Sequence, residues 1–329
     1  MQPFSFVQAK NASGAIGAVS DAAGASFFAG GTTLLDLMKL DVIAPTRLVD
    51  INNLPFSKIE VGSERVTIGA NVRNSDLASH PAIRQGFPAL SEALLSGASA
   101  QLRNMATTAG NLMQRTRCSY FRDLSARCNK RNPGAGCDAI SGVNKNHAVL
   151  GTSEQCIATH PSDMCVALVI LDATVQTQLP DGTTRLIPIG DFHLMPGSTP
   201  HMETALEHGE LITHIHLPIV SLARRSHYLK VRDRASYEFA LASAAVAVTT
   251  EGGVIAEARV GLGGIATRPW RSLEAETALI GQPASDATFL AAANAALAGA
   301  RPQQHNAFKI GLAKETLMIA LQQVTKGNN

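Results

Sequence analysis

The chain has 329 residues, of which 45% are hydrophobic and 16% charged, and its formal net charge at pH 7 is +2. This length allows two or three domains, and the composition is that of a folded protein rather than a disordered one. The near-neutral charge provides no broad basic field for a nucleic acid and no polybasic run for a membrane surface.

The first residues and the hydropathy of the chain indicate where in the cell the protein is expected. The first residues, MQPFSFVQAK, lack a charged region followed by an apolar one, so no signal peptide is expected. No run of 18 apolar residues is free of charge, so no membrane insertion is expected. We expect a protein made in the cytoplasm, which becomes periplasmic only if it is exported with a signal-bearing partner.

Residues 1–53 are predicted to form a small α/β unit. A helix is expected over residues 13–24, then a short apolar strand, a Gly-Gly turn and a helix over 25–40. A second strand follows over 46–52.

Residues 54–222 are predicted to form a second unit. Residues 58–72 alternate as in a β-hairpin, and residues 88–106 begin as a helix. Residues 165–189 run from an apolar helix into a strand pair that turns at Asp181-Gly182, and a further strand is expected over 210–219.

Residues 223–329 are predicted to form the third unit. Several strands, with a helix among them, are expected over residues 226–265. A C-terminal helix is expected over 308–324 because its apolar residues repeat with helical spacing. The residues on that face are Ala313, Leu317, Ala320, Leu321 and Val324. The whole chain is therefore predicted to be α+β with mostly antiparallel pairing.

The sequence FFAGGTTLL places two glycines between the first strand and its helix. Gly30 and Gly31 allow positive φ and a close approach to a ligand, and the amides and hydroxyls of Thr32 and Thr33 could donate to a pyrophosphate. The glycine spacing is neither that of a P-loop nor GxGxxG. A tight strand–helix turn with a threonine cap is the alternative.

Two further motifs are rich in hydroxyls and small residues. NMATTAGNL covers residues 104–112, and ATHPSDM covers residues 158–164, directly before an apolar helix. Ser162 or Asp163 would cap that helix, and Pro161 would help to start it. Because no nucleophile–base pair is evident in the motifs, together they suit the binding of a nucleotide cofactor better than acid–base chemistry.

All five cysteines lie between residues 118 and 165, namely Cys118, Cys128, Cys137, Cys156 and Cys165. An odd, clustered set without a signal peptide is a poor disulfide framework. Separated cysteines in turn-forming loops suit an iron–sulfur cluster, whereas zinc sites usually use paired ligands a few residues apart. We predict Cys118, Cys128, Cys137 and Cys156 as ligands. Cys165, within an apolar helix, is predicted to be core.

The segment around these cysteines is basic. Residues 115–145 hold seven Lys or Arg against two Asp, and positive charge nearby would offset the thiolate charge of a cluster. Zinc, and a solvated basic loop with buried free cysteines, remain as alternatives.

Taken together, the motifs resemble the FAD-binding subunit of the xanthine dehydrogenase and molybdenum aldehyde oxidoreductase family. FAGGTTLLDLMK, RNMATTAGNL and THPSDM are similar to the three FAD motifs of that family, in the same order. The cysteine insert, residues 115–157 approximately, resembles the periplasmic aldehyde oxidoreductase type, which carries an extra [4Fe–4S] cluster.

The resemblance implies a fold and a set of site residues. It implies a two-part FAD-binding region of the PCMH or vanillyl-alcohol-oxidase type, and then a C-terminal α/β domain with a three-stranded antiparallel sheet. The pyrophosphate would lie on the first loop, and the other motifs and Lys230 would complete the site. The implied FAD-binding residues are Phe28, Ala29, Gly30, Gly31, Thr32, Thr33, Leu34, Thr107, Gly110, Asn111, Thr159, Ser162, Asp163 and Lys230.

The resemblance also implies partners and a role. A large subunit with a molybdenum cofactor would oxidise the substrate, and a small subunit with two [2Fe–2S] clusters would pass the electrons to this chain. FAD would deliver them to an external electron acceptor. The alternatives are a self-sufficient flavin oxidase with His160 as its base, and a zinc-bearing structural subunit.

Overall fold

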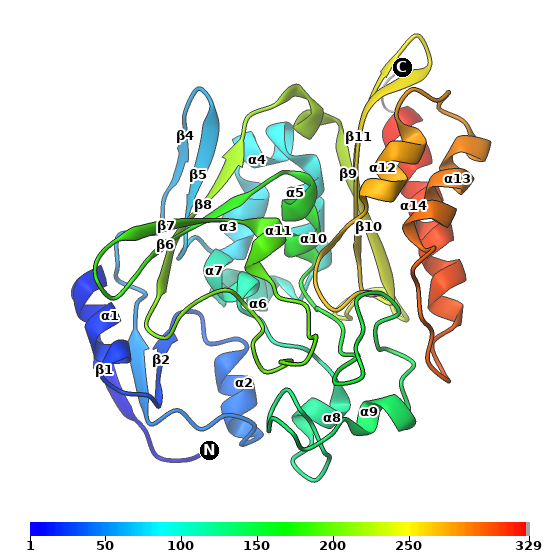
Figure 1. Ribbon diagram of the computed structural model, residues 1–329. Helices are drawn as coiled ribbons and strands as arrows, with labels where there is room; N and C mark the ends of the chain where they lie inside the picture. The colour runs from blue at the N-terminus through cyan, green and yellow to red at the C-terminus, as the bar shows by residue number, and fades with distance from the viewer. Residues whose placement is uncertain (327–329) are drawn as a thin grey trace.

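The computed structural model describes residues 1–326, whose strands form three β-sheets (Figure 1). The first sheet belongs to the N-terminal unit and has the order β1-β3-β2, with both pairings parallel. The unit consists of β1 (Ser5–Gln8), α1 (Ala12–Ser20), β2 (Ala25–Phe28), α2 (Leu34–Lys39) and β3 (Arg47–Asp50). The sequence predicted its helices and two strands, but β1 was missed, and its parallel pairing departs from the antiparallel expectation.

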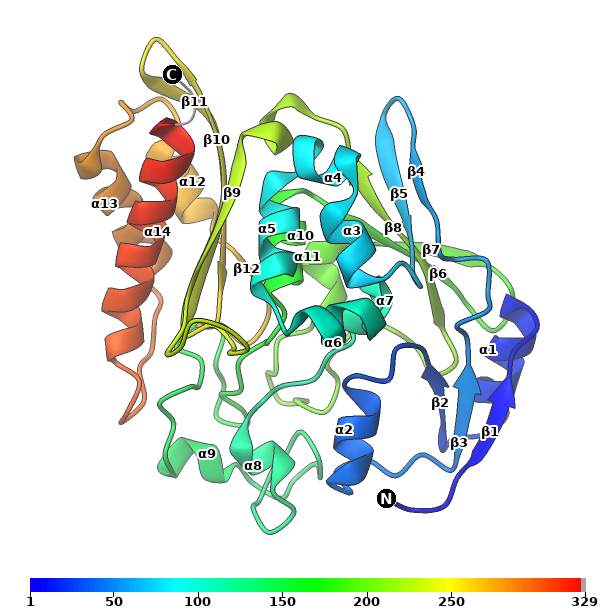
Figure 2. The same ribbon diagram turned by 180° about the vertical axis from the view of Figure 1, so that it is seen from behind.

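The second sheet is antiparallel and has the order β4-β5-β8-β6-β7. Its strands are β4 (Ile59–Val61), β5 (Arg65–Gly69), β6 (Thr174–Gln178), β7 (Thr184–Pro188) and β8 (Leu211–Pro218). The helices between β5 and β6 lie beside this sheet (Figure 2). Outside the cysteine segment, they are α3 (Asn74–Ser79), α4 (Pro81–Gly86), α5 (Pro88–Ser96), α6 (Ala100–Met105), α7 (Thr108–Leu112) and α10 (Asp163–Ile170), and the short α11 (Ile189–Phe192) follows β7.

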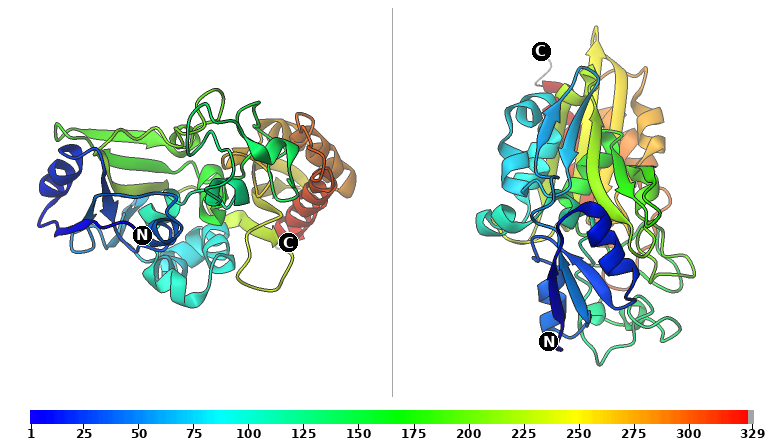
Figure 3. Two further views of the ribbon diagram at one scale, coloured as in Figure 1. Left: turned by 90° about the horizontal axis from the view of Figure 1, so that it is seen from below. Right: turned by 90° about the vertical axis from the view of Figure 1, so that its left-hand side faces the viewer.

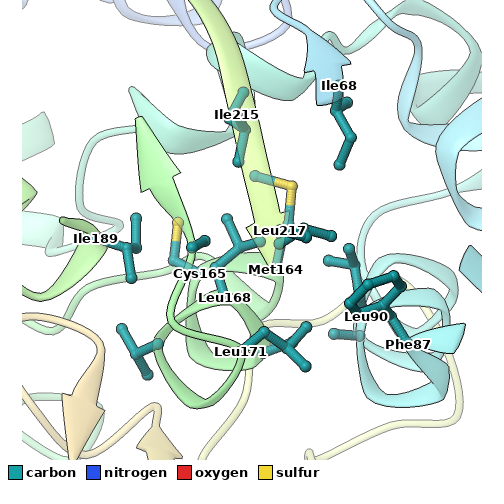
Figure 4. Close-up of a cluster of buried hydrophobic side chains, with 14 of the residues drawn as sticks. Ile68, Phe87, Leu90, Met164, Cys165, Leu168, Leu171, Ile189, Ile215 and Leu217 are labelled. Atoms are coloured by element: carbon teal, nitrogen blue, oxygen red, sulfur yellow. The ribbon is translucent and has the colours of Figure 1, made fainter. Parts of the chain in front are cut away.

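Helix α10 is the centre of the largest hydrophobic core. All eight of its residues are buried, as expected for a helix that is apolar on every side. Figure 4 shows Met164, Cys165 and Leu168 of this helix among side chains from the sheet and from α5. The prediction that Cys165 is a core residue is confirmed, since its side chain is 0% exposed.

The third sheet is antiparallel and has the order β12-β11-β10-β9. Its strands are β9 (Ser226–Val231), β10 (Ala242–Glu251), β11 (Val254–Gly263) and β12 (Trp270–Arg271), and the 3-10 turn η1 (Ser221–Arg225) precedes β9. The sheet therefore has four strands rather than the predicted three, because the two-residue β12 adds to β11. The helix expected within residues 226–265 is also absent, since that stretch forms β9, β10 and β11 with their connections.

Three helices cover one face of the third sheet, α12 (Leu273–Leu279), α13 (Asp286–Ala296) and α14 (Phe308–Lys326), as Figures 1 and 2 show. Helix α14 packs on β10. The apolar face predicted for it is confirmed, because Ala313, Leu317, Ala320, Leu321 and Val324 are all buried. Across residues 1–326, no helix is both long and apolar enough to pass through a bilayer.

The cysteine segment extends from one side of the molecule, next to α2 (Figures 1 and 3). It is mostly loop and contains two helices of four residues, α8 (Ser119–Arg122) and α9 (Asp138–Ser141). A small core of Leu37, Val42, Phe121 and Cys128 joins the segment to the N-terminal unit. Its last part joins the C-terminal core through Val149 and Leu150. The segment thus packs against both the N-terminal unit and the C-terminal unit.

Candidate functional site

A cavity of about 760 Å³ lies between the N-terminal unit and the second sheet. One wall is the turn between β2 and α2, and another is the start of α7. The opposite wall is the segment that enters β8, which the sequence did not indicate. Of the residues predicted to bind FAD, those that line this cavity are Ala29, Gly30, Gly31, Thr32, Thr33, Leu34, Thr107 and Gly110.

The turn between β2 and α2 presents unpaired backbone donors to this cavity. Within the described residues, the N–H groups of residues 30–34 have no hydrogen-bond acceptor on the protein. Gly31 has a φ of +70°, and a Cβ there would lie 2.8 Å from the ring of Phe28. These donors are available to an anionic group, and Gly31 is required by the backbone conformation of the turn.

Two polar residues that the sequence did not single out tie the first motif to the second. Asn52 donates to the carbonyl oxygen of Ala29 over 3.0 Å, and Arg73 donates to Asn52 Oδ1 over 3.0 Å. The same guanidinium donates to the carbonyl oxygen of Met105. Gly30 is packed against Met105 so closely that a Cβ would lie 2.1 Å from this oxygen. The two loops are therefore held in contact.

The second and third motifs are joined through helix caps. Thr107 caps α7 by accepting from the N–H of Gly110 over 3.1 Å. Ser162 caps α10 by accepting from the N–H of Cys165 over 3.1 Å, as the capping alternative predicted. The hydroxyl of Ser162 also donates to Asn111 Oδ1 over 2.7 Å, which links the two motifs directly.

Asp163 and Lys230 form a buried ion pair. Lys230 Nζ lies 2.8 Å from Asp163 Oδ2, and the two side chains are 4% and 9% exposed. The hydroxyl of Tyr228 donates to Asp163 Oδ1 over 2.6 Å. Burial, followed by the charge of Asp163, raises the pKa of Tyr228 well above its usual value. These residues join α10 to β9 and are not among the residues that line the 760 Å³ cavity.

A second cavity, of about 300 Å³, adjoins the first and shares Met113, Arg115 and Thr204 with it. Thr159 lines this second cavity, whereas Phe28, Asn111, Ser162, Asp163 and Lys230 line neither. Glu203 pairs here with both Arg115 and Lys130, at 2.5 and 3.1 Å. The two cavities therefore lie next to each other between the first loop and the third motif.

His160, Cys165 and His193 meet beside the second cavity, with their potential ligand atoms within 4.8 Å of one another. His193 Nε2 donates to the carbonyl oxygen of Leu112 over 3.0 Å, so its Nδ1 carries a lone pair. His160 Nδ1 accepts from the N–H of Ser162 over 3.3 Å, which leaves the proton on Nε2. Ligand histidines ordinarily donate through their second nitrogen. His193 has this arrangement but His160 does not, because its Nδ1 accepts and its Nε2 has no acceptor among the described residues, so the three groups together do not suit a metal ion.

The four predicted ligand cysteines come together in the cysteine segment. Burial is the largest cause that raises the pKa of Cys118, and the nearby Cys128 and Cys156 raise it further by charge repulsion. Cys128 adds to the effect of burial in the same way on Cys137 and on Cys156. Cys128 and Cys137 also face each other in an isolated β-bridge. All five cysteines are free, and the groups that perturb the pKa of Cys165 include none of the other four.

The surroundings of these sulfurs disfavour a bare thiolate. Burial raises the pKa of Cys118 to about 12 and that of Cys156 to about 11, and burial also raises the pKa of Cys137. Opposing this, backbone N–H groups of α8 and α9 point at Cys118 and Cys137, which are the N-cap residues of those helices. Burial therefore opposes the thiolate form and the N–H donors favour it, and a bound cation would favour it further, because cysteine binds metals as a thiolate.

Most of the basic residues of the segment have specific partners. Arg117 and Arg122 both pair with Asp36, and Arg127 pairs with Asp138. Lys130 pairs with Glu203, and its charge also lowers the pKa of Cys156, in the direction that the sequence predicted for positive charge near the cysteines.

Comparison with known proteins finds a family match for each of the two parts of the chain. Residues 2–220 match the family model described as FAD binding domain in molybdopterin dehydrogenase, and residues 227–324 match the one described as CO dehydrogenase flavoprotein C-terminal domain. The chain is 53% identical over 299 residues to the aldehyde oxidoreductase FAD-binding subunit PaoB of Escherichia coli strain K12, covering 91% of each. It is 28% identical over 284 residues to the glyceraldehyde dehydrogenase medium chain of Sulfolobus acidocaldarius, covering 86% of this chain and 83% of that one.

Solved structures share the fold. Quinoline 2-oxidoreductase from Pseudomonas putida 86 superposes with a TM-score of 0.77 at 23% identity, covering 99% of this chain and 98% of that one. Carbon monoxide dehydrogenase from Hydrogenophaga pseudoflava gives 0.76 at 24% identity, with the same coverage. Together with the family matches, these findings show that the chain is an oxidoreductase subunit that belongs to the FAD-binding subunits of the molybdenum aldehyde oxidoreductase family.

Proposed function

We propose that the chain is the electron-transfer subunit of a heteromeric aldehyde oxidoreductase and that it carries both FAD and a [4Fe–4S] cluster. The observation that carries this proposal is a short connection between the two sites. The N–H of Cys118 donates to Thr116 Oγ1 over 3.2 Å, and this hydroxyl donates to the carbonyl oxygen of Thr159 over 3.0 Å. One residue thus joins a cysteine ligand to the wall of the second cavity.

The first cavity fits FAD. The free N–H groups of residues 30–34 would hold the pyrophosphate, and Thr107, Gly110 and Asn111 would continue the site. Thr159 would contact the cofactor in the adjoining cavity. We assign Ser162, Asp163 and Lys230 to the same site as groups that hold the motifs in position. When bound, FAD supplies the redox chemistry, while the protein binds and orients it.

Cys118, Cys128, Cys137 and Cys156 fit an iron–sulfur cluster better than zinc. Around a tetrahedral zinc with Zn–S bonds of about 2.3 Å, the sulfurs would be about 3.8 Å apart. Among the described residues, no three of these sulfurs lie within 4.8 Å of one another. A cubane separates its four thiolates farther, because each one binds a different iron.

The proposed partners follow from the relatives, whose names describe FAD-binding subunits and medium chains. We propose a large subunit with the molybdenum cofactor, in which the substrate is oxidised, a small subunit with two [2Fe–2S] clusters, and an external electron acceptor. A role for His160 as the base of a self-sufficient oxidase is disfavoured. Burial and the neighbouring His193 lower its pKa well below the usual value. We further propose that the chain stays in the cytoplasm unless it is exported to the periplasm together with a partner that carries a signal peptide.

The test is a cysteine series in anaerobically purified protein. Wild type should show flavin absorption, a broad cluster shoulder, iron and no zinc. Cys118→Ser, Cys128→Ser, Cys137→Ser and Cys156→Ser should each lower the iron content, because a hydroxyl is a poor ligand for iron. Cys165→Ser is the control and should keep its iron. Zinc in place of iron, or iron loss only in Cys165→Ser, would contradict the cluster.

A further inference from the structure

A histidine that the sequence did not single out contacts one of the proposed cluster ligands. His147 Nε2 lies 3.1 Å from the sulfur of Cys118, although the two residues are 29 positions apart. His147 is 5% exposed, and its ring packs at a tilt against Tyr120, with the ring centroids 6.1 Å apart. The contact is therefore shielded from water. A hydrogen bond to sulfur has a larger effect in such a buried place than in water.

The direction of this hydrogen bond follows from the ligand chemistry. A thiolate bound to iron has no proton, so the imidazole nitrogen must be the donor. The proton of the neutral ring then lies on Nε2, and Nδ1, which has no hydrogen-bond partner in the described part of the chain, carries the lone pair. A free Cys118 thiol would permit the opposite direction, so the donor role belongs to the cluster-loaded protein.

The C-terminal unit holds His147 in this position. Its carbonyl oxygen accepts from Asn306 Nδ2 and from Lys309 Nζ, each over 3.2 Å. Both donors are 0% exposed, and Lys309 also donates to the carbonyl oxygen of Gly264 over 2.6 Å. Because two buried side chains fix the backbone of His147, its ring is preorganised toward Cys118.

The other donors that reach the cluster ligands belong to the backbone. The N–H groups of Tyr120 and Phe121 act on Cys118, and the N–H of Ala158 lies 3.4 Å from the sulfur of Cys156. Among residues 1–326, His147 is the side chain that forms a hydrogen bond of this kind to these sulfurs. Its contribution can therefore be removed without changing the backbone.

We propose that His147 donates its Nε2–H to the Cys118 sulfur and so raises the reduction potential of the cluster. This rests on the proposed function. The reduced cluster carries one more negative charge than the oxidised one, so an N–H donor at a ligand sulfur stabilises the reduced form more. His147 is not a ligand in this proposal. It acts on the cluster through its hydrogen bond to the sulfur of Cys118.

The experiment is a potentiometric titration of the whole complex followed by electron paramagnetic resonance. His147→Phe keeps a ring of similar size but has no N–H, and we expect a more negative cluster potential. A tenfold fall in the reduced-to-oxidised ratio at a fixed potential corresponds to about 59 mV for one electron. His147→Gln keeps an N–H donor and should recover part of the shift. His227→Phe is the matched control, because His227 contacts Glu92 and Gln323.

The outcomes separate this inference from the proposed function. Absence of iron from wild type would refute the cluster and the inference together. A normal iron content with equal potentials in wild type and His147→Phe would refute the inference alone. Loss of iron in His147→Phe but not in Cys118→Ser would make His147 a ligand and also refute it. If His147→Phe does not fold, pulsed resonance on wild type with ¹⁵N-labelled histidine still decides, since the proposal requires a weak nitrogen coupling to the reduced cluster.

Discussion

Ser162 and Asn111, which are 51 positions apart, are joined by a hydrogen bond of 2.7 Å. The same serine caps helix α10. One hydroxyl therefore fixes both the start of the most buried helix of the second unit and the relative position of two of the three motifs proposed to bind FAD.

Ser162→Ala should lose both functions of this hydroxyl. Loss of an N-cap costs about 1 kcal/mol of folding free energy, and loss of the link between Ser162 and Asn111 should weaken FAD retention. Thermal unfolding and the FAD content of purified protein measure the two effects. Ser285→Ala is the control, because Ser285 caps α13 in the C-terminal unit. It should show the loss of stability without loss of FAD, and equal loss of FAD in the two variants would contradict the assignment.

Gly31→Val should remove most of the bound FAD. The φ of +70° disfavours a β-branched residue, and the new side chain would meet the Phe28 ring, so the turn must change shape. Flavin absorbance per protein measures the effect. Gly311→Val is the control, because Gly311 is exposed in α14 and a Cβ there meets nothing within 4 Å. A folded Gly31→Val variant with full FAD occupancy would argue against the pyrophosphate site.

Cys156→Ser should retain less FAD than Cys118→Ser. Cys156 precedes Thr159 by three residues in the chain, so loosening of its loop reaches the third motif directly. The link from Cys118 through Thr116 uses the backbone N–H of Cys118, which serine keeps. FAD release on gel filtration distinguishes the two variants. Greater loss of FAD from Cys118→Ser would reverse this order.

Lys230→Met should destabilise the fold strongly. It leaves Asp163 as a buried carboxylate without its cation, a change that typically costs about 3–5 kcal/mol. Lys145→Met is the control, because its pair with Asp233 is exposed and should contribute at most about 1 kcal/mol. Urea unfolding followed by circular dichroism gives both values. Similar losses of unfolding free energy in the two variants would contradict the prediction that breaking the buried Lys230 pair is more destabilising than breaking the exposed one.

Lys309 should make stability depend on pH. Burial lowers its pKa from 10.5 to about 7 in the folded protein. Between those values the unfolded chain holds a proton that the folded chain has released, so this lysine makes stability rise with pH above about 7. His147 is the titratable residue beside it, and its own pKa is lowered to about 4, outside this window. Lys309→Met should lose the rise between pH 7 and pH 9 in urea unfolding. If the free energy of unfolding changed with pH in the same way in wild type and in Lys309→Met, the lowered pKa of Lys309 would be contradicted.

Much of the fold was predictable where the pattern is local. The hairpin of β4 and β5, the strand pair of β6 and β7, and the apolar face of α14 follow from alternation, turn residues and helical spacing. Strand β1 was missed because it is short and pairs with β3, about 42 residues along the chain, and β12 was missed because it has only two residues. The helix expected within residues 226–265 became strand, because pairing in the third sheet overrides local helix propensity.

The sequence by itself determined the chemistry available to this protein. Gly31 was identifiable because a glycine pair follows a strand, and Cys165 could be separated from the other cysteines because it lies in an apolar helix. Only the tertiary structure decided which groups meet. Asn52, Arg73 and His147 gave no local signal of a role, since the contacts of Arg73 with Asn52 and Met105, and of His147 with Cys118, span 21 to 32 residues. Long-range contacts depend on how the units pack, and no local pattern encodes them.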